Sequence, residues 1–293
     1  MPVFDTPEPI SAEIDLAVGD VRITAGDRQD TAVDVRPSDT AQEQDVRVAE
    51  QTRVEFSGGS LLVRAPRQLG RSLLGRPGSV DITIGLPAGS RVRAGVSVAA
   101  VHCAGRLGEC RIKTSAGDIE VELAGQVDLS TGAGAVVVDR ATGRADISTG
   151  TGRIRLGELE DAAVIKNSNG DTRIDSVAGD LRVSASNGDI TVGRAAADVR
   201  ASTAHGHVRV DAIVRGTAAL STGYGDVEVG IPAGTAARLD VHTKFGHLRN
   251  DLEAAQSPGP AEESADVSAR TSFGDIVIRR SRPAQSAQED ENR

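Results

Sequence analysis

A glycine recurs along this sequence about every eighteen residues, and that repeat constrains the possible folds more than any other feature. The repeated glycines are Gly117, Gly134, Gly152, Gly170, Gly188, Gly206, Gly225, Gly246 and Gly274. The intervals between them are 17, 18, 18, 18, 18, 19, 21 and 28 residues. A fixed period of this length is typical of a chain built from stacked copies of one structural unit.

A second series of punctuating residues falls half a period away, so each unit has two turns. It runs through Gly108, Gly125, Gly143, Asp161, Gly179, Ala197 and Gly216. After most members of both series the residues two and four places on are apolar, as with Val127 and Leu129 after Gly125. Apolar residues at alternate positions indicate a strand with one buried face. Each period is therefore predicted to hold two short strands and two turns.

Two short strands form no core alone, but parallel stacking of many such pairs makes two facing sheets. We therefore predict an all-β fold, a parallel β-solenoid (β-helix) with eighteen-residue coils, right-handed by the general preference of crossover connections. An antiparallel meander is the alternative, less favoured because like residues recur at like phases. A chain with no Trp, one Tyr and four Phe must also fill its core with small aliphatic side chains, which suits narrow coils.

Stacking further predicts ladders of like side chains along the rod. The residues directly before the repeated glycines are, in sequence order, Ala116, Ala133, Thr151, Asn169, Asn187, His205, Tyr224, Phe245 and Phe273. Asn beside Asn and ring beside ring are pairings that stacked coils favour. In the column directly after the glycines, Asp171 and Asp189 are expected to be the one adjacent pair of acids.

The repeat divides the chain into three predicted regions. Residues 1–95 are β-rich but irregular, and we expect them to form opening coils and an irregular N-terminal β cap. Residues 96–280 form the repeat solenoid, with a disordered insertion near 251–266 that is rich in Pro, Gly and acidic residues. Residues 281–293 are similar in composition and are expected to form a disordered tail.

Charge and hydropathy argue against two classes of partner. The net charge of -9 makes nucleic acid a poor partner, since phosphate binding needs clustered basic residues. No stretch approaches the roughly 18 apolar residues that span a bilayer, and residues 1–23 lack the features of a secretory signal. A cytoplasmic location is expected. Cys103 and Cys110 are interpreted as small buried residues in preference to a redox pair.

One basic loop is the best surface candidate for a protein partner. Between residues 64 and 78, arginines surround three leucines on an otherwise acidic chain. We take Arg67, Arg71 and Arg76 as a weak candidate binding site, although a plain surface loop is the favoured interpretation.

No catalytic residue, metal site or cofactor is predicted. Parallel β-helices can host sugar chemistry on carboxylates, which draws attention to Asp171, Asp189 and Asp226. Each directly follows a turn glycine, where backbone geometry itself favours Asp, so a structural role is preferred. His205 and His207 form an H-x-H pattern without a third ligand. Motifs for phosphate loops, dinucleotide binding or a nucleophilic serine are absent from the sequence.

The repeat resembles a known family. Its G-D-[IV]-x-V coils, its S-T-G and N-S-N-G turns, and its LPAG and IPAG segments at Leu86 and Ile231 are similar to a bacterial β-strand-repeat family of unknown function labelled "putative adhesin". The resemblance spans about residues 10 to 280 and implies a β-solenoid. The functional hypothesis is a non-enzymatic, adhesin-like interaction or scaffold module, with self-association through an end or edge as one form. The alternative is a carbohydrate-binding or carbohydrate-active β-helix protein.

Overall fold

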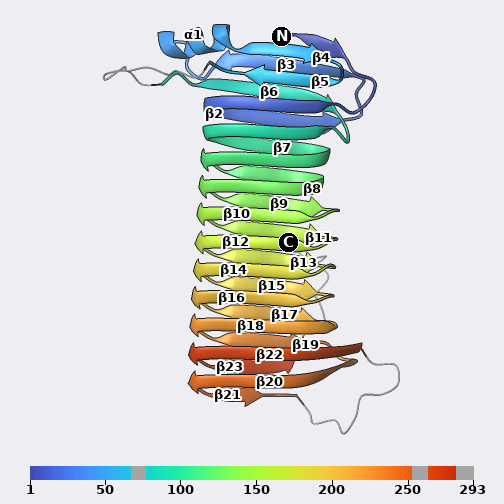
Figure 1. The fold of residues 1–293 in the computed structure, drawn as a ribbon, viewed down its shortest axis with the longest axis vertical. Helices are drawn as coiled ribbons and strands as arrows, with labels where there is room; N and C mark the ends of the chain where they lie inside the picture. Colours follow the sequence, from blue (N-terminus) through green and yellow to red (C-terminus); the bar gives the residue numbers. More distant parts are fainter. Residues whose placement is uncertain (67–76, 253–262, 282–293) are drawn as a thin grey trace, which may run out of the picture.

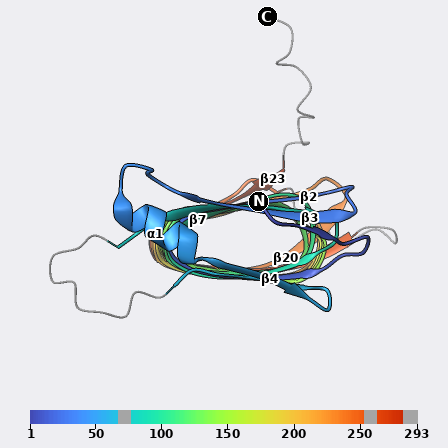
Figure 2. The ribbon, with the colours of Figure 1, turned by 90° about the horizontal axis from the view of Figure 1, so that it is seen from above.

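The computed structural model describes residues 1–66, 77–252 and 263–281, which form one rod of stacked coils (Figure 1). The strands run across the long axis of the rod. Seen along that axis the coils overlie one another as a flattened ring with two opposed faces (Figure 2). The predicted β-solenoid is confirmed.

The regular middle of the rod repeats two strands per coil. Its strands are β7 (Arg91–Ala116), β8 (Ile119–Ala133), β9 (Val136–Ala141), β10 (Ala145–Thr151), β11 (Ile154–Leu159), β12 (Ala163–Asn169), β13 (Thr172–Val177), β14 (Leu181–Asn187), β15 (Ile190–Ala195), β16 (Val199–His205), β17 (Val208–Ile213), β18 (Gly216–Tyr224) and β19 (Val227–Ile231). All pair in parallel with the strand one coil away. Ala145, for example, lies opposite Val127 on one side and Ala163 on the other, eighteen residues away in each direction. The parallel register excludes the meander.

The core is a column of aliphatic side chains between the two faces. Every second residue of these strands points inward, which gives the alternating burial of β11 and β15. Ile147 and Ile165 face each other across neighbouring coils, with 2% and 0% of their surface exposed. Because the same position carries an aliphatic residue in coil after coil, each layer packs on the next without large rings.

The N-terminal end departs from simple stacking. Its elements are β1 (Val3–Asp5), β2 (Ser11–Gly26), β3 (Asp30–Pro37), α1 (Glu43–Gln51), β4 (Arg53–Ser57), β5 (Ser60–Arg64) and β6 (Val80–Pro87). The first long strand, β2, is not the outermost coil: β7 pairs with one edge, and β5 and β6 pair with the other. The first long strand thus lies one coil inside the rod, and the chain then forms β5 and β6 on its outer side before it returns past β2 as β7.

A cap closes this end. Strand β3 pairs antiparallel with β6, β1 with β3, and β4 with β5. Helix α1, which the sequence did not predict, lies over this end (Figure 1), and its Val48 is buried in the core. Its Asp45 carboxylate accepts the backbone N–H groups of Ser79 at 2.9 Å and Asp39 at 3.2 Å. These bonds tie the helix to the segment that enters β6.

The C-terminal end also inverts the sequence order. Its strands are β20 (Thr235–Phe245), β21 (Leu248–Asn250), β22 (Glu263–Phe273) and β23 (Ile276–Arg280). Strand β22 lies between β18 and β20, and β23 lies between β19 and β21. The coil that comes last in sequence is therefore second from the end in space. Stacking in sequence order, which the ladders above assumed, is wrong here.

The inserted coil also bears on the predicted regions. Strand β22 begins at Glu263, so the last residues of the insertion expected near 251–266 lie in a strand. Residues 253–262 and 282–293 lie outside the described residues, as does the 67–76 segment.

Candidate functional site: the turn corner and the C-terminal end

The repeated glycines form one corner of the rod, where neighbouring coils approach too closely for a side chain. At Gly188 the backbone φ is +127°, and a Cβ atom would lie 2.2 Å from the carbonyl oxygen of Gly170 in the preceding coil. Gly117 shows the same combination, with φ +136° and the Ala99 carbonyl at 1.9 Å. Only glycine tolerates this conformation and this contact. The glycine ladder is therefore a structural requirement of the corner.

A buried polar ladder, which the sequence analysis missed, fixes the same corner from inside. Three threonine hydroxyls each donate a hydrogen bond to the carbonyl of the corner glycine in the preceding coil: Thr149 to Gly134, Thr203 to Gly188 and Thr222 to Gly206. Where Ala185 interrupts the column, Asn167 donates from its Nδ2 to Gly152 O at 3.1 Å and to Gly170 O at 2.8 Å. The signal was the Thr or Asn three residues before each repeated glycine other than Gly188.

The acids suspected of catalysis stand outside the corner and bond backbone groups. Asp171 Oδ1 accepts the N–H of Asp189 at 3.1 Å, and Asp189 Oδ1 accepts the N–H of His207 at 2.7 Å. Asp226 Oδ1 accepts the N–H of Asp275 at 2.8 Å, so these two acids are also neighbours. The expectation of one adjacent acid pair is wrong, because the last two coils exchange places. Each carboxylate thus ties one coil to the next.

Four of the ring side chains form a continuous stack along the exposed corner. His205 stacks on Tyr224 with ring centres 5.0 Å apart, Tyr224 on Phe273 at 4.8 Å, and Phe273 on Phe245 at 4.9 Å. The predicted ladder is present, but Phe273 precedes Phe245 along the rod. Since each ring covers the face of the next, the inner rings present their edges to solvent. Only Phe245, in the last coil, has no described ring on its outer face.

The C-terminal end is open where the N-terminal end is closed. In β22 the inward residues Ala265, Val267 and Ala269 are at most 2% exposed. Their partners in β20, which are Ala237, Leu239 and Val241, are only partly buried. Within the described residues β20 pairs with β22 alone, and β21 with β23 alone. One side of the last coil therefore leaves both apolar side chains and backbone groups uncovered.

Exposed apolar groups concentrate at this end. Of the seven large apolar residues exposed in the described chain, four lie in its last three coils: Tyr224, Phe245, Leu248 and Phe273. The outward face of β20 carries both signs of charge, with Arg238, Asp240, His242 and Lys244 exposed at alternate positions. Asp240 pairs with Arg270 of β22 at 3.3 Å. An apolar row with a mixed polar rim is the composition of a protein interface.

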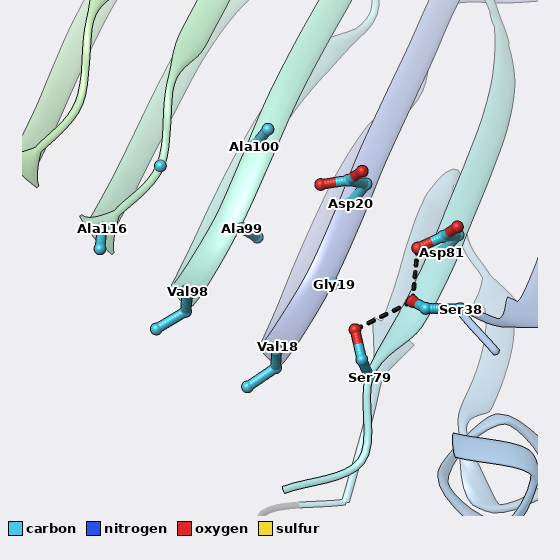
Figure 3. Close-up of a pocket in the computed structure, with 11 residues that line it drawn as sticks. Val18, Gly19, Asp20, Ser38, Ser79, Asp81, Val98, Ala99, Ala100 and Ala116 are labelled. Atoms are coloured by element: carbon cyan, nitrogen blue, oxygen red, sulfur yellow. Dashed lines mark hydrogen bonds between the residues drawn. The ribbon is translucent and has the colours of Figure 1, made fainter. Parts of the chain in front are cut away.

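A shallow hollow of about 440 Å³ lies at the same corner near the cap (Figure 3). Asp20 and Asp81 line it with Ser38 and Ser79, and Ser38 Oγ donates to Asp81 at 2.6 Å. Its lining holds no histidine or lysine, and Asp20 and Asp81 are its charged residues. The hollow therefore offers hydroxyl and carboxylate groups for hydrogen bonds.

The remaining titratable candidates have structural partners. Cys103 and Cys110 are buried free thiols, and a hydrogen bond with Cys103 together with burial raises the pKa of Cys110 well above its ordinary value. His207 Nδ1 accepts the backbone N–H of Asp226 at 3.0 Å. Across residues 1–66, 77–252 and 263–281 no group of three His, Cys, Asp or Glu side chains forms a metal site. Arg67, Arg71 and Arg76 lie outside the described residues.

One family of known proteins matches almost the whole chain. Residues 11–279 match the family described as Toastrack DUF4097, which has a β-solenoid fold. No curated protein matches the chain. In the part of the chain that the structure describes, no helix has the length and hydropathy to cross a membrane.

Several solved structures align over nearly the whole chain at low identity. A "putative cell adhesion protein" from Clostridium sporogenes ATCC 15579 is 11% identical, covers 95% of this chain and 98% of its own, and has a TM-score of 0.24. A "putative adhesin" from Bacteroides fragilis NCTC 9343 is 13% identical, with coverages of 94% and 95% and a TM-score of 0.33. One from Parabacteroides merdae ATCC 43184 is 9% identical, with coverages of 96% and 95% and a TM-score of 0.37.

Proposed function

This chain belongs to the Toastrack DUF4097 family, and we propose that it acts as a non-enzymatic protein-interaction module of adhesin-like, scaffold type. In this proposal its binding surface is the open C-terminal end of the rod. The observation that supports it is the partly buried row of Ala237, Leu239 and Val241 on a strand whose outer edge no described strand covers. Along that edge, no strand in the described part of the chain pairs with the backbone groups of β20.

The direction of those backbone groups follows from the regular coils. There, the inward residue of this column donates its N–H to the next coil, as Val127 does to Arg144 O at 3.0 Å and Leu181 to Asp198 O at 2.8 Å. Leu239 occupies the same column, so its N–H points to where a next coil would lie. A strand added along this edge would satisfy such groups and cover the apolar row.

The geometry favours a protein partner over a sugar. Carbohydrate binding commonly uses the open face of an aromatic ring, whereas Tyr224 and Phe273 are covered on both faces by neighbouring rings. At the C-terminal end of this stack, Phe245 has no described ring on its outer face, and one ring makes a small platform. A binding role for Arg67, Arg71 and Arg76 and the cytoplasmic location stay predictions.

The test blocks the edge and asks what binding is lost. We would capture tagged chain from the cells that produce it, beside a Leu239→Pro variant, in which the ring removes the outward N–H and obstructs an added strand. Leu239→Ala is the matched control, since it trims the side chain and keeps the N–H. Val98→Ala, at an exposed valine of the opposite half, is the second control.

We expect a specific protein, or an untagged copy of the chain, to be retained by the wild type and by Val98→Ala but lost from Leu239→Pro. Leu239→Ala should retain it with reduced yield, because the backbone pairing survives. A cooperative thermal melt is the check that the Leu239→Pro variant is folded. If the folded proline variant retains everything that the wild type retains, the open end is not the binding surface.

A further inference from the structure

We propose that the occupant of the C-terminal end is a second copy of this chain, joined edge to edge through β20 in an antiparallel, two-fold arrangement centred on Leu239. This inference rests on the proposed function, because it assigns a partner to the same edge. A two-fold axis perpendicular to the rod places β20 against β20 of the second copy and continues the sheet across the junction.

The difference between the two ends explains why the assembly would stop at two copies. The cap covers the N-terminal end, where β6 is paired on its outer side by β3 and its inward residues Val80, Ile82 and Ile84 are at most 1% exposed. A rod with two open ends would polymerise, whereas a rod with one open end can only meet another open end. The contact is then the same patch on both copies and closes on itself.

The apolar row of β20 matches itself in this register. Residues directly opposite each other in an antiparallel pair share a face, so inward residues meet inward residues. With Leu239 at the centre, Leu239 lies opposite Leu239, and Ala237 lies opposite Val241 on both sides of the axis. Each of these residues is partly buried in the single chain. Strand β20 of the second copy would cover these residues in the same way as β20 covers Ala265, Val267 and Ala269 of β22 within one chain.

Charges on the outward face select the same register. With Leu239 at the centre, Arg238 of each copy lies opposite Asp240 of the other, which gives two attractive pairs. Moving the centre to Arg238 or Asp240 sets each of those residues against itself. Moving it to Val241 sets Arg238 against Lys244. Attraction on the outer face and apolar matching on the inner face therefore coincide at Leu239.

The first experiment measures mass in solution as a function of concentration. Sedimentation velocity of the purified full chain at micromolar concentrations should show a dimer, and small-angle scattering should show a rod about twice as long as the monomer. Arg238→Asp and Asp240→Arg should each raise the dimer dissociation constant by about tenfold to hundredfold, because two attractive pairs become two repulsive pairs.

The decisive step mixes the two variants. The Arg238→Asp chain is acidic at both positions of the outward pair, and the Asp240→Arg chain is basic at both. In a mixed dimer each acidic position of one copy faces a basic position of the other, so both outward pairs become attractive again. We therefore expect the mixture to dimerise while neither variant does so alone. A variant that had lost its partner through misfolding would not be rescued by mixing, and thermal melts of each variant provide the independent check.

Three results would overturn the inference. One is a wild-type chain that stays monomeric at these concentrations. The second is a dimer that both single variants preserve, since the contact would then lie elsewhere. The third is a monomer that dimerises only after residues 282–293 are removed, because the chain's own tail would then be the occupant. Each leaves the proposed function standing if the Leu239→Pro variant still loses a different captured protein.

Discussion

The two ends of the rod solve the same problem differently. At the N-terminal end, antiparallel strands and a helix cover the first coils, and buried Leu61 and Val63 of β5 are shielded as fully as residues in the middle. At the C-terminal end the last coil keeps its inward row only partly buried. Capping therefore comes from residues outside the repeat, because the repeat itself always offers another edge.

The ends also share one device. The first and the last long strands, β2 and β22, each lie one coil inside the rod. Strand β2 lies between β6 and β7, and β22 lies between β18 and β20. Neither strand can peel away from an edge without disturbing two neighbours. In a stack whose coils touch only their nearest neighbours, fraying begins at the outermost coil. At both ends a strand of the outermost coil therefore pairs with a strand from near a terminus: β6 with β2, and β20 with β22.

The largest expected difference contrasts a stacked turn with a turn at the open end. Gly188→Ala places a Cβ atom 2.2 Å from the Gly170 carbonyl oxygen of the preceding coil, at a backbone φ of +127° that favours glycine. We expect a loss of about 4 kcal/mol or more, or failure to fold. Gly234 has φ +84°, and a Cβ atom added there would have no neighbouring atom within 4 Å. Gly234→Ala should therefore lower the free energy of unfolding by only about 1–2 kcal/mol.

Urea unfolding followed by circular dichroism measures both glycine variants. Equal costs would mean that the coil-to-coil contact at Gly188 adds nothing to the backbone strain. The corner would then be less tightly stacked than its geometry indicates.

A matched pair of leucines compares the two ends directly. Leu61 of the capped end is fully buried, so Leu61→Ala should destabilise the protein by about 2–5 kcal/mol. Leu239 of the open end is only partly buried, so Leu239→Ala should cost about 1 kcal/mol or less in dilute solution. The same unfolding measurement checks both. A large loss at Leu239 under monomeric conditions would show that something already covers the open end.

The buried polar ladder tests whether Asn167 compensates for the missing threonine at Ala185 in the regular middle of the rod. Asn167→Thr would still reach Gly152 but would leave the Gly170 carbonyl without its Nδ2 donor, at a cost of about 1 kcal/mol. Ala185→Thr in the same chain supplies a hydroxyl to Gly170, as Thr203 does to Gly188, and should remove that cost. A double-mutant cycle measures the coupling. Simple additivity would mean that the two positions do not share this carbonyl.

The smallest perturbation uses thiol reactivity to compare exposure in the regular coils with exposure at the open end. Cys110 should be inert in the native state at pH 8, since the bond with Cys103 and burial raise its pKa and so keep it protonated. A cysteine placed by Val241→Cys at the open end should react with Ellman's reagent faster by roughly two orders of magnitude. The rate should fall at concentrations where dimers form. Equal rates for both thiols would contradict the difference in cover between the regular coils and the open end.

The eighteen-residue coils and their parallel register were predictable because each residue type recurs at one phase. The order of the last coils was not, since the long interval between Gly246 and Gly274 does not reveal whether the returning coil stacks outside or inside its predecessor. Helix α1 was missed because it is short and its place depends on contacts of Asp45 and Val48 with distant strands.

The open end was predictable in kind but not in position. A repeat without a matching terminal sequence indicates an exposed edge, and self-association through an end followed from that. Which residues form the edge depends on the exchange of β20 and β22, which the sequence pattern alone does not show. The threonine column, in contrast, was visible in the repeat and was interpreted only as part of the turns.

The exchanged order of the last two coils determines the order in which the coils can fold during synthesis. As the chain leaves the ribosome, β20 and β21 emerge before β22 and β23, yet their places lie beyond a coil that does not exist yet. The growing rod can add coils one after another only as far as β18 and β19. The last stage must wait for the final strands, which close the gap from within. The strands β20 and β21 can therefore take their final places only after β22 and β23 have been made.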